Sequence, residues 1–154
     1  MLKSFSIKLF VYALFGFAIC ALIYNLSCKQ DSGLNRLAAD FKSANQSDSI
    51  ESMLKLYCLD GIDTFSITRL RGVLEYELGI PIKQIQFEPL TGAPEETIEF
   101  VHDEIMYEPS LAPLYRMRVT YIDENHFTSL YTIGKDSSGT WKIITAKPQL
   151  SHRD

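Results

Sequence analysis

The apolar residues of this chain change their spacing at Gly79-Ile80-Pro81. Before that point they recur at the intervals of an α-helix, and after it they alternate with polar residues in the two-residue period of β-strands. Helices that come first and strands that follow, without βα alternation, are typical of an α+β domain. We therefore expect about three helices packed on a curved antiparallel meander sheet of four to five strands.

Three helices are predicted before the change of spacing. The first begins near Leu34, the second follows Asp48 as its N-cap with Glu51 three residues later, and the third starts near Thr64 and ends at Gly79. The apolar stripes of the first and third helices are Leu34, Leu37, Ala38, Phe41 and Ala44, and Ile67, Leu70, Leu74 and Leu78.

The strands are predicted from alternation. They lie around residues 85–87, 98–102, 115–121, 127–133 and 141–146, and the last three are joined by turns at 123–126 and 136–139. Residues 107–114 contain Pro109 and Pro113. Because proline cannot donate a hydrogen bond to a neighbouring strand, this segment is predicted not to be a central strand.

This order of elements resembles the NTF2-like (SnoaL-like, cystatin-like) α+β roll. The resemblance covers Leu34 to Pro148 and is carried by the break "CLDGID" between helices and by the closing hairpin "YTIGKDSSGTWKI". The segment from Met53 to Phe87 is similar to small secreted or lipid-anchored bacterial proteins of that superfamily. The resemblance implies a conical sheet whose concave face forms a pocket with one helix. It implies no particular reaction, because such folds carry many functions.

The N-terminal segment predicts a membrane location. Residues 9–28 carry no charge and follow Lys3 and Lys8, and about 20 apolar residues suffice to cross a bilayer. Three alternatives stay open: an uncleaved anchor, a lipoprotein acylated at Cys28, or a cleaved secretory signal. Asn25 is unusual for a lipoprotein box. All three place the rest of the chain on the extracytoplasmic, periplasmic side.

The expected division is therefore an anchor or signal/lipoprotein leader at 1–28, a linker at 29–33, a domain at 34–148 and a tail at 149–154. The formal net charge is −4, and Lys3 and Lys8 belong to the leader, so the domain is more acidic still. This argues against nucleic acid as a partner. Cys58 is the one cysteine outside the leader, and its apolar neighbours predict burial. No motif indicates a cofactor or a metal.

A candidate pocket follows from strand parity. The residues His102, Tyr115, Met117, Tyr121 and Tyr131 are predicted to share the core-facing side of the sheet. His102 is either a histidine satisfied by hydrogen bonds in the core or a pocket histidine. In an enzyme it would need an acid such as Asp63 within reach.

Three functions are compatible with these patterns. The first is a non-enzymatic interaction or accessory module, with a protein partner or a second copy on an apolar outer sheet face. The second is a binder of a small apolar or aromatic ligand. The third, least favoured, is a hydrolase or isomerase that uses His102.

Overall fold

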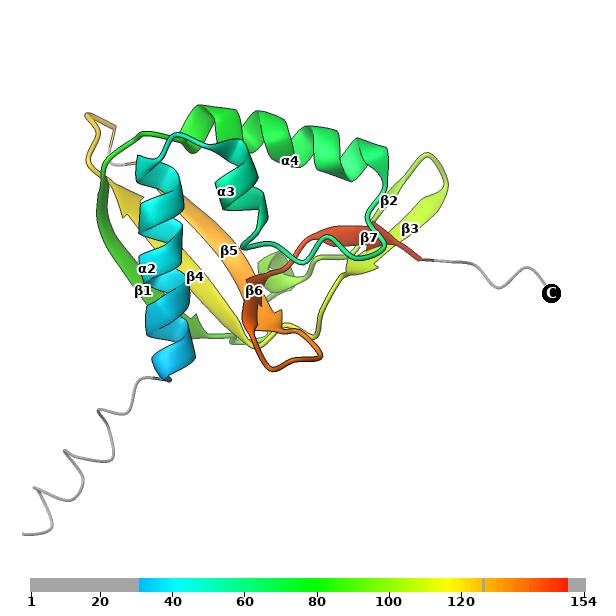
Figure 1. Cartoon of the computed structure of the whole chain (residues 1–154). Coiled ribbons are helices and arrows are strands. Elements are labelled where there is room, and N and C mark those ends of the chain that lie inside the picture. Colours follow the sequence, from blue (N-terminus) through cyan, green and yellow to red (C-terminus); the bar gives the residue numbers. More distant parts are fainter. Residues whose placement is uncertain (1–30, 126, 150–154) are drawn as a thin grey trace, which may run out of the picture. The chain divides into compact units, whose positions relative to one another are not determined.

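The computed structural model describes residues 31–125 and 127–149. Three helices come first, as expected: α2 (Ser32–Gln46), α3 (Ile50–Leu54) and α4 (Thr64–Glu77) (Figure 1). Helix α2 begins inside the segment predicted as a linker, and α4 begins at the predicted Thr64 and ends at Glu77, two residues before Gly79. The predicted leader at 1–28, with Cys28, lies outside the described residues. In the part that is described, no helix is long and apolar enough to span a bilayer.

The strands form two antiparallel sheets. The larger has the order β1-β4-β5-β6 and the smaller the order β2-β3-β7. Their bounds are β1 (Ile82–Pro89), β2 (Phe100–His102), β3 (Ile105–Pro109), β4 (Tyr115–Tyr121), β5 (Thr128–Lys135), β6 (Trp141–Ile143) and β7 (Ala146–Pro148), with a short 3-10 helix η1 (Pro94–Glu96) before β2. The α+β class is confirmed.

The single meander expected from the sequence is wrong. The strand predicted at 141–146 is divided, because the chain leaves the larger sheet at Ile144 and enters the smaller one. The Ile144 amide still donates a hydrogen bond to the carbonyl of Thr132 in β5. The carbonyl of the next residue, Thr145, instead accepts a hydrogen bond of 2.8 Å from the amide of Ser110, which lies beside β3. Alternation of apolar and polar residues predicts that a segment is a strand, but it does not predict which strand it pairs with.

The proline-containing segment also differs from its prediction. Residues 105–109 form β3, which is the central strand of the smaller sheet. Its pairing with β2 ends at Tyr107, and Pro109 pairs only with Ala146 of β7. The proline therefore stands at a strand end, where only one neighbour is present and a missing N–H is tolerated.

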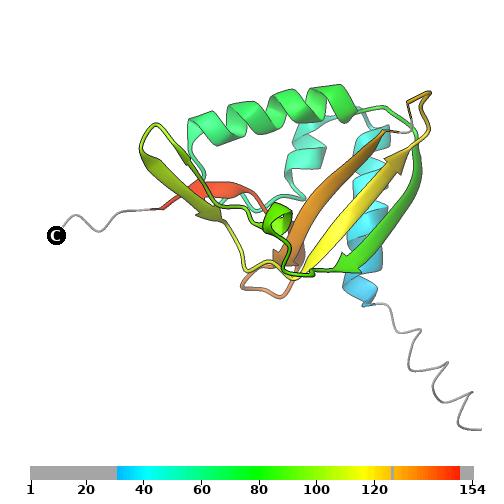
Figure 2. The same cartoon turned by 180° about the vertical axis from the view of Figure 1, so that it is seen from behind.

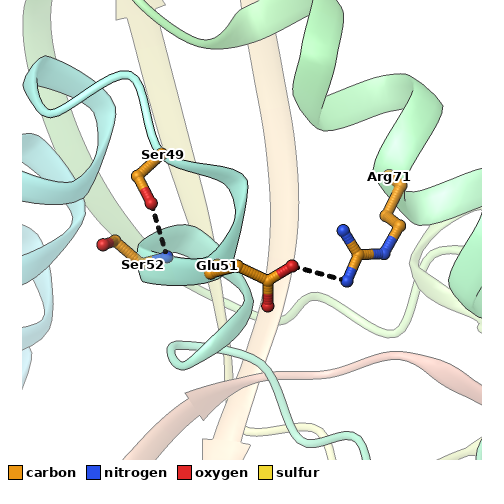
Figure 3. A network of polar contacts seen from close by, with 4 residues as sticks. All are labelled: Ser49, Glu51, Ser52 and Arg71. Atoms are coloured by element: carbon orange, nitrogen blue, oxygen red, sulfur yellow. Dashed lines mark hydrogen bonds and ion pairs between the residues drawn. The ribbon is translucent and has the colours of Figure 1, made fainter.

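Asp48 is not the N-cap of the second helix, which is a further correction. Ser49 caps α3, and its Oγ accepts a hydrogen bond from the Ser52 amide at 3.3 Å (Figure 3). Asp48 has a φ of 50°, the left-handed conformation, in the turn after α2. An N-cap residue needs extended backbone, and Ser49 has it, with φ −121° and ψ 109°.

The main core lies between α2, α3 and the inner face of the larger sheet. Phe41 of α2 is fully buried, as are Met117, Val119 and Ile133 on the alternate positions of β4 and β5. Cys58 is buried, as its neighbours predicted. Tyr57 reaches the same region because residues 56–58 pair with β6: the amides of Cys58 and Ile143 donate to the carbonyls of Ile143 and Leu56, each at 2.9 Å.

Candidate functional site

A cavity of about 860 Å³ lies where the two sheets separate, under α4. The helix forms one wall, β5 and the crossing segment 143–146 form another, and Ile98 and Phe100 close it from the side of η1. Figure 2 shows η1 on the face of the larger sheet opposite α2. The space exists because β6 pairs only with Ile133–Lys135 of β5, so that Ser129–Tyr131 form an edge toward the cavity.

Both ends of α4 are held in place. At its start, Asp63 Oδ1 accepts from the Ser66 amide at 2.8 Å. Just beyond its end, Asn45 of α2 donates to the Ile80 carbonyl at 2.8 Å. An exposed ion pair of 2.7 Å between Arg71 and Glu51 joins α4 to α3 (Figure 3). The helix is therefore positioned over the cavity by its ends more than by this ion pair, since exposed pairs contribute little.

The closed end of the cavity carries one carboxylate, Glu77, which is only 6% exposed. Its Oε1 accepts from the Ser129 hydroxyl at 2.5 Å, and its Oε2 accepts from the Tyr131 hydroxyl. The Tyr121 hydroxyl lies 3.3 Å from the same Oε2 and 3.4 Å from the Tyr131 oxygen. The carboxylate is therefore held by hydroxyl groups of β4 and β5, and no lysine or arginine of the described residues pairs with it.

Three tyrosines surround this carboxylate: Tyr57 and Tyr121 are buried, and Tyr131 is partly buried. Burial, and then the charge of Glu77, raises the pKa of Tyr57 well above its usual value. Burial also raises the pKa of Tyr131, and that of Tyr121 to about 12. All three hydroxyls therefore stay protonated at neutral pH and remain hydrogen-bond donors. The Tyr57 hydroxyl is buried and has no hydrogen-bond partner among the described residues.

The open end of the cavity has a different character. Its exposed lining residues are Arg69 and Val73 of α4 and Leu130 of β5, and Phe100 of β2, which lines the cavity from the smaller sheet, is exposed too. The Arg69 guanidinium lies 5.5 Å from the centre of the Phe65 ring, which also lines the cavity. The rest of the lining is mainly apolar and aromatic, and it also includes the polar residues Ser66, Arg116, Thr132 and Thr145.

The structure brings together three of the five predicted pocket residues. Tyr131 lines the cavity, and its hydroxyl lies 3.4 Å from the Tyr121 hydroxyl. Met117 of β4 is the residue opposite Tyr131 of β5 and lies in the core. Tyr115 lies further along β4, in edge-on contact with Trp141. Four of the five predicted residues thus lie on the neighbouring strands β4 and β5.

His102 does not share a face with these residues, contrary to the parity argument. It lies in β2 of the smaller sheet, where its ring stacks on Phe65 of α4 at 4.2 Å. Its nearest acid is Asp103 at 3.4 Å, and its side chain is 41% exposed. Asp63, the acid considered as its partner, instead accepts from the Tyr107 hydroxyl at 2.6 Å. The parity argument was wrong for His102 because alternation predicts a shared face only for strands of the same sheet, and β2 belongs to the smaller sheet.

Sequence reasoning missed Glu77, Ser129 and Tyr57. A signal for Glu77 was present: it stands seven residues after Leu70 and three after Leu74, on the apolar stripe of the third helix. Ser129 likewise has the inward parity of Tyr131. Tyr57 carried no such signal, because its place depends on the pairing of residues 56–58 with β6.

The described residues contain no group of three or more His, Cys, Asp or Glu side chains that would hold a metal ion. No protein-family model matches the chain, and no curated protein matches it. The chemistry of the cavity is therefore the basis on which a function can be assigned.

Proposed function

We propose that this protein binds a small, mainly apolar ligand in the cavity between its two sheets. The observation that carries the proposal is a cavity of about 860 Å³ with apolar and aromatic walls and a single buried carboxylate at its closed end. Small-molecule sites have volumes of roughly 300–1,000 Å³ and combine apolar walls with a few placed polar groups.

The interaction module favoured by the sequence has less support. It predicts an apolar patch on the outer face of the larger sheet. That face instead carries Arg116, Arg118 and Thr120 of β4, paired with Glu88, Gln86 and Gln84 of β1. Arg118 binds Glu88 through two hydrogen bonds of 2.7 and 3.0 Å. Leu130 of β5 stands among these polar groups as an isolated apolar side chain.

The proposal includes the location and the family that the sequence suggests. A leader at 1–28 would hold the domain at the extracytoplasmic side of a membrane, so that ligands would arrive from that side. The order of three helices before antiparallel strands supports an NTF2-like relationship. The division of the sheet is a departure from a simple roll.

Indole tests the proposal, because it is a soluble apolar ring with one hydrogen-bond donor. The full-length protein in lipid nanodiscs should give a saturation-transfer NMR signal with indole that empty nanodiscs lack. Leu70→Trp, which fills the cavity from α4, should remove the signal, and so should Ala146→Trp from β7. Tyr76→Trp is the matched control, since Tyr76 is 71% exposed on the same helix.

Circular dichroism of each variant shows whether it is folded. An indole signal that survives in both folded cavity-filling variants contradicts the proposal. So does a wild-type protein that shows no more signal than empty nanodiscs.

A further inference from the structure

We infer that the ligand of this cavity carries a positively charged ammonium head group, which Glu77 binds at the closed end. This inference rests on the proposed function and names the class of ligand. It depends on the geometry around one carboxylate and one tyrosine hydroxyl, and on the aromatic side chains that surround them.

Glu77 keeps an acceptor position for a ligand. A carboxylate has about four lone-pair positions. Ser129 uses one on Oε1, whereas Tyr131 and Tyr121 converge on Oε2. Oε1 therefore has a second lone-pair position, and Glu77 itself lines the cavity. A ligand that donates a hydrogen bond would complete this set.

The charge of Glu77 favours a cation over a neutral donor. None of the ion pairs among the described residues includes Glu77. Two arginines line the same cavity. Arg69 is exposed and stands eight residues earlier on α4, which is about 12 Å along the helix axis, whereas Arg116 of β4 places its charge near Glu88 and Glu96. Electrostatic attraction is stronger where water is excluded, so a cation bound at the closed end gains more than a hydroxyl group would.

Tyr57 supplies a second, independent observation. Tyr57 is 6% exposed and lines the cavity, and no hydrogen bond of ordinary geometry joins its hydroxyl to another described residue, although the Tyr131 side chain is close enough to oppose the rise in its pKa. Unpartnered buried hydroxyls are costly unless a ligand or water satisfies them. The hydroxyl oxygen can accept one N–H of an ammonium group while Glu77 accepts another.

The aromatic side chains that line the cavity also favour a cation. Tyr57 and Tyr131 meet edge to face, with ring centres 6.5 Å apart, and Phe127 lines the same cavity. The faces of such rings attract cations. Carboxylate, hydroxyl and aromatic rings together suit an ammonium group on an apolar or aromatic body.

Three compounds with one ring system test the inference. Tryptamine, tryptophol and indole-3-acetate carry an ammonium, a hydroxyl and a carboxylate on the same indole. For the full-length protein in nanodiscs, we expect tryptamine to bind at least roughly tenfold more tightly than tryptophol, and indole-3-acetate to bind most weakly. Dissociation constants come from NMR titration, with empty nanodiscs subtracted.

Two variants test whether Glu77 and Tyr57 are responsible for the preference for tryptamine. Glu77→Gln should weaken tryptamine binding by roughly tenfold or more and change tryptophol binding by less than about threefold, since only the cation loses its counter-charge. Tyr57→Phe removes one oxygen from a buried position and is expected to fold. It should weaken tryptamine binding severalfold, so the inference can be tested even if Glu77→Gln does not fold.

The outcomes separate this inference from the proposed function. If indole and tryptophol bind in the cavity as tightly as tryptamine does, the charge preference is wrong and the binding function stands. If no indole compound binds, both fail. Equal tryptamine affinity in the wild type and in Tyr57→Phe would exclude the tyrosine from the site.

Discussion

Asp63 connects two parts of the fold with one side chain. Its Oδ1 caps α4 through the Ser66 amide at 2.8 Å, and its Oδ2 accepts from the buried Tyr107 of β3 at 2.6 Å. The Tyr107 hydrogen bond, and then the Ser66 amide, lower the pKa of Asp63 below its ordinary value. The N-cap residue of α4 is thereby tied to the smaller sheet beside the cavity.

The lowered pKa predicts a pH dependence of stability. A carboxyl whose pKa is lower in the folded protein stabilises the fold above its unfolded pKa, near 4, and this contribution disappears as the pH falls through the folded value. Asp63→Asn keeps a capping oxygen but has no charge to lose. We expect its melting temperature to fall less than that of the wild type between about pH 5 and about pH 3.

Circular dichroism melts across this range measure the difference. Asp60→Asn, three residues earlier and exposed, is the control for the loss of one negative charge. Parallel curves for the wild type and Asp63→Asn would show that the hydrogen bonds to Asp63 do not depend on its charge.

At the scale of elements, replacing two glycines by alanine is predicted to change the free energy of unfolding in opposite directions. A Cβ at Gly134 of β5 would stand 2.4 Å from the Ala112 carbonyl oxygen, so the strand and the segment before β4 are in close contact there. Gly72 of α4 has nothing within 4 Å of such a Cβ. Gly134→Ala should therefore lower the free energy of unfolding by about 1–3 kcal/mol or more. Gly72→Ala should raise it by up to about 1 kcal/mol, because alanine favours a helix.

Urea unfolding of the two variants in parallel makes each the control of the other. A neutral or stabilising Gly134→Ala would mean that the segment at Ala112 moves away easily. Such a result would remove the close contact as a constraint on this part of β5.

At the scale of the whole molecule, the two sheets differ in how much core they contain. Tyr107 of the smaller sheet is buried, but four apolar side chains of its hairpin are at least 40% exposed: Phe100, Val101, Ile105 and Met106. The hairpin turn adds strain, since Asp103 and Glu104 both have positive φ, at 48° and 63°, where glycine or asparagine is preferred. The larger sheet is buried against α2 and α3.

Local unfolding should therefore begin in the smaller sheet. Segments with few buried apolar contacts open at a lower free energy than the core. Hydrogen exchange of the full-length protein, followed by mass spectrometry, should show residues 100–109 exchanging well before residues 115–121. Equal protection of both segments would mean that the sheets unfold as one unit. Early opening of β2 and β3 would also give ligands a route to the cavity.

Local features of the fold were predictable from sequence, as particular residues show. Of the predicted stripe of the first helix, Leu34, Leu37, Phe41 and Ala44 are buried and Ala38 is partly buried. The turn at 136–139 forms as expected, with Asp136 Oδ1 accepting from the Ser138 and Thr140 amides at 2.9 and 3.0 Å. Such features depend on residues a few positions apart, whose spacing can be read directly.

The candidate site was only partly predictable. Tyr131 and Tyr121 follow from strand parity, and Glu77 was accessible from its place on the apolar stripe of α4. Tyr57 and the true position of His102 were not, because both depend on which segments pair. Tyr57 is placed by its bridge to Ile143, and His102 by membership of the smaller sheet.

The amino-acid sequence by itself determined the α+β class, the three helices and the turn at 136–139, since helical and strand periods and turn residues act over short stretches of chain. Only the tertiary structure decided that the chain changes sheets after Ile144, and this change separates the sheets and opens the cavity. Each strand presents the same alternation to any neighbour, so the choice of partner is made by contacts between distant residues.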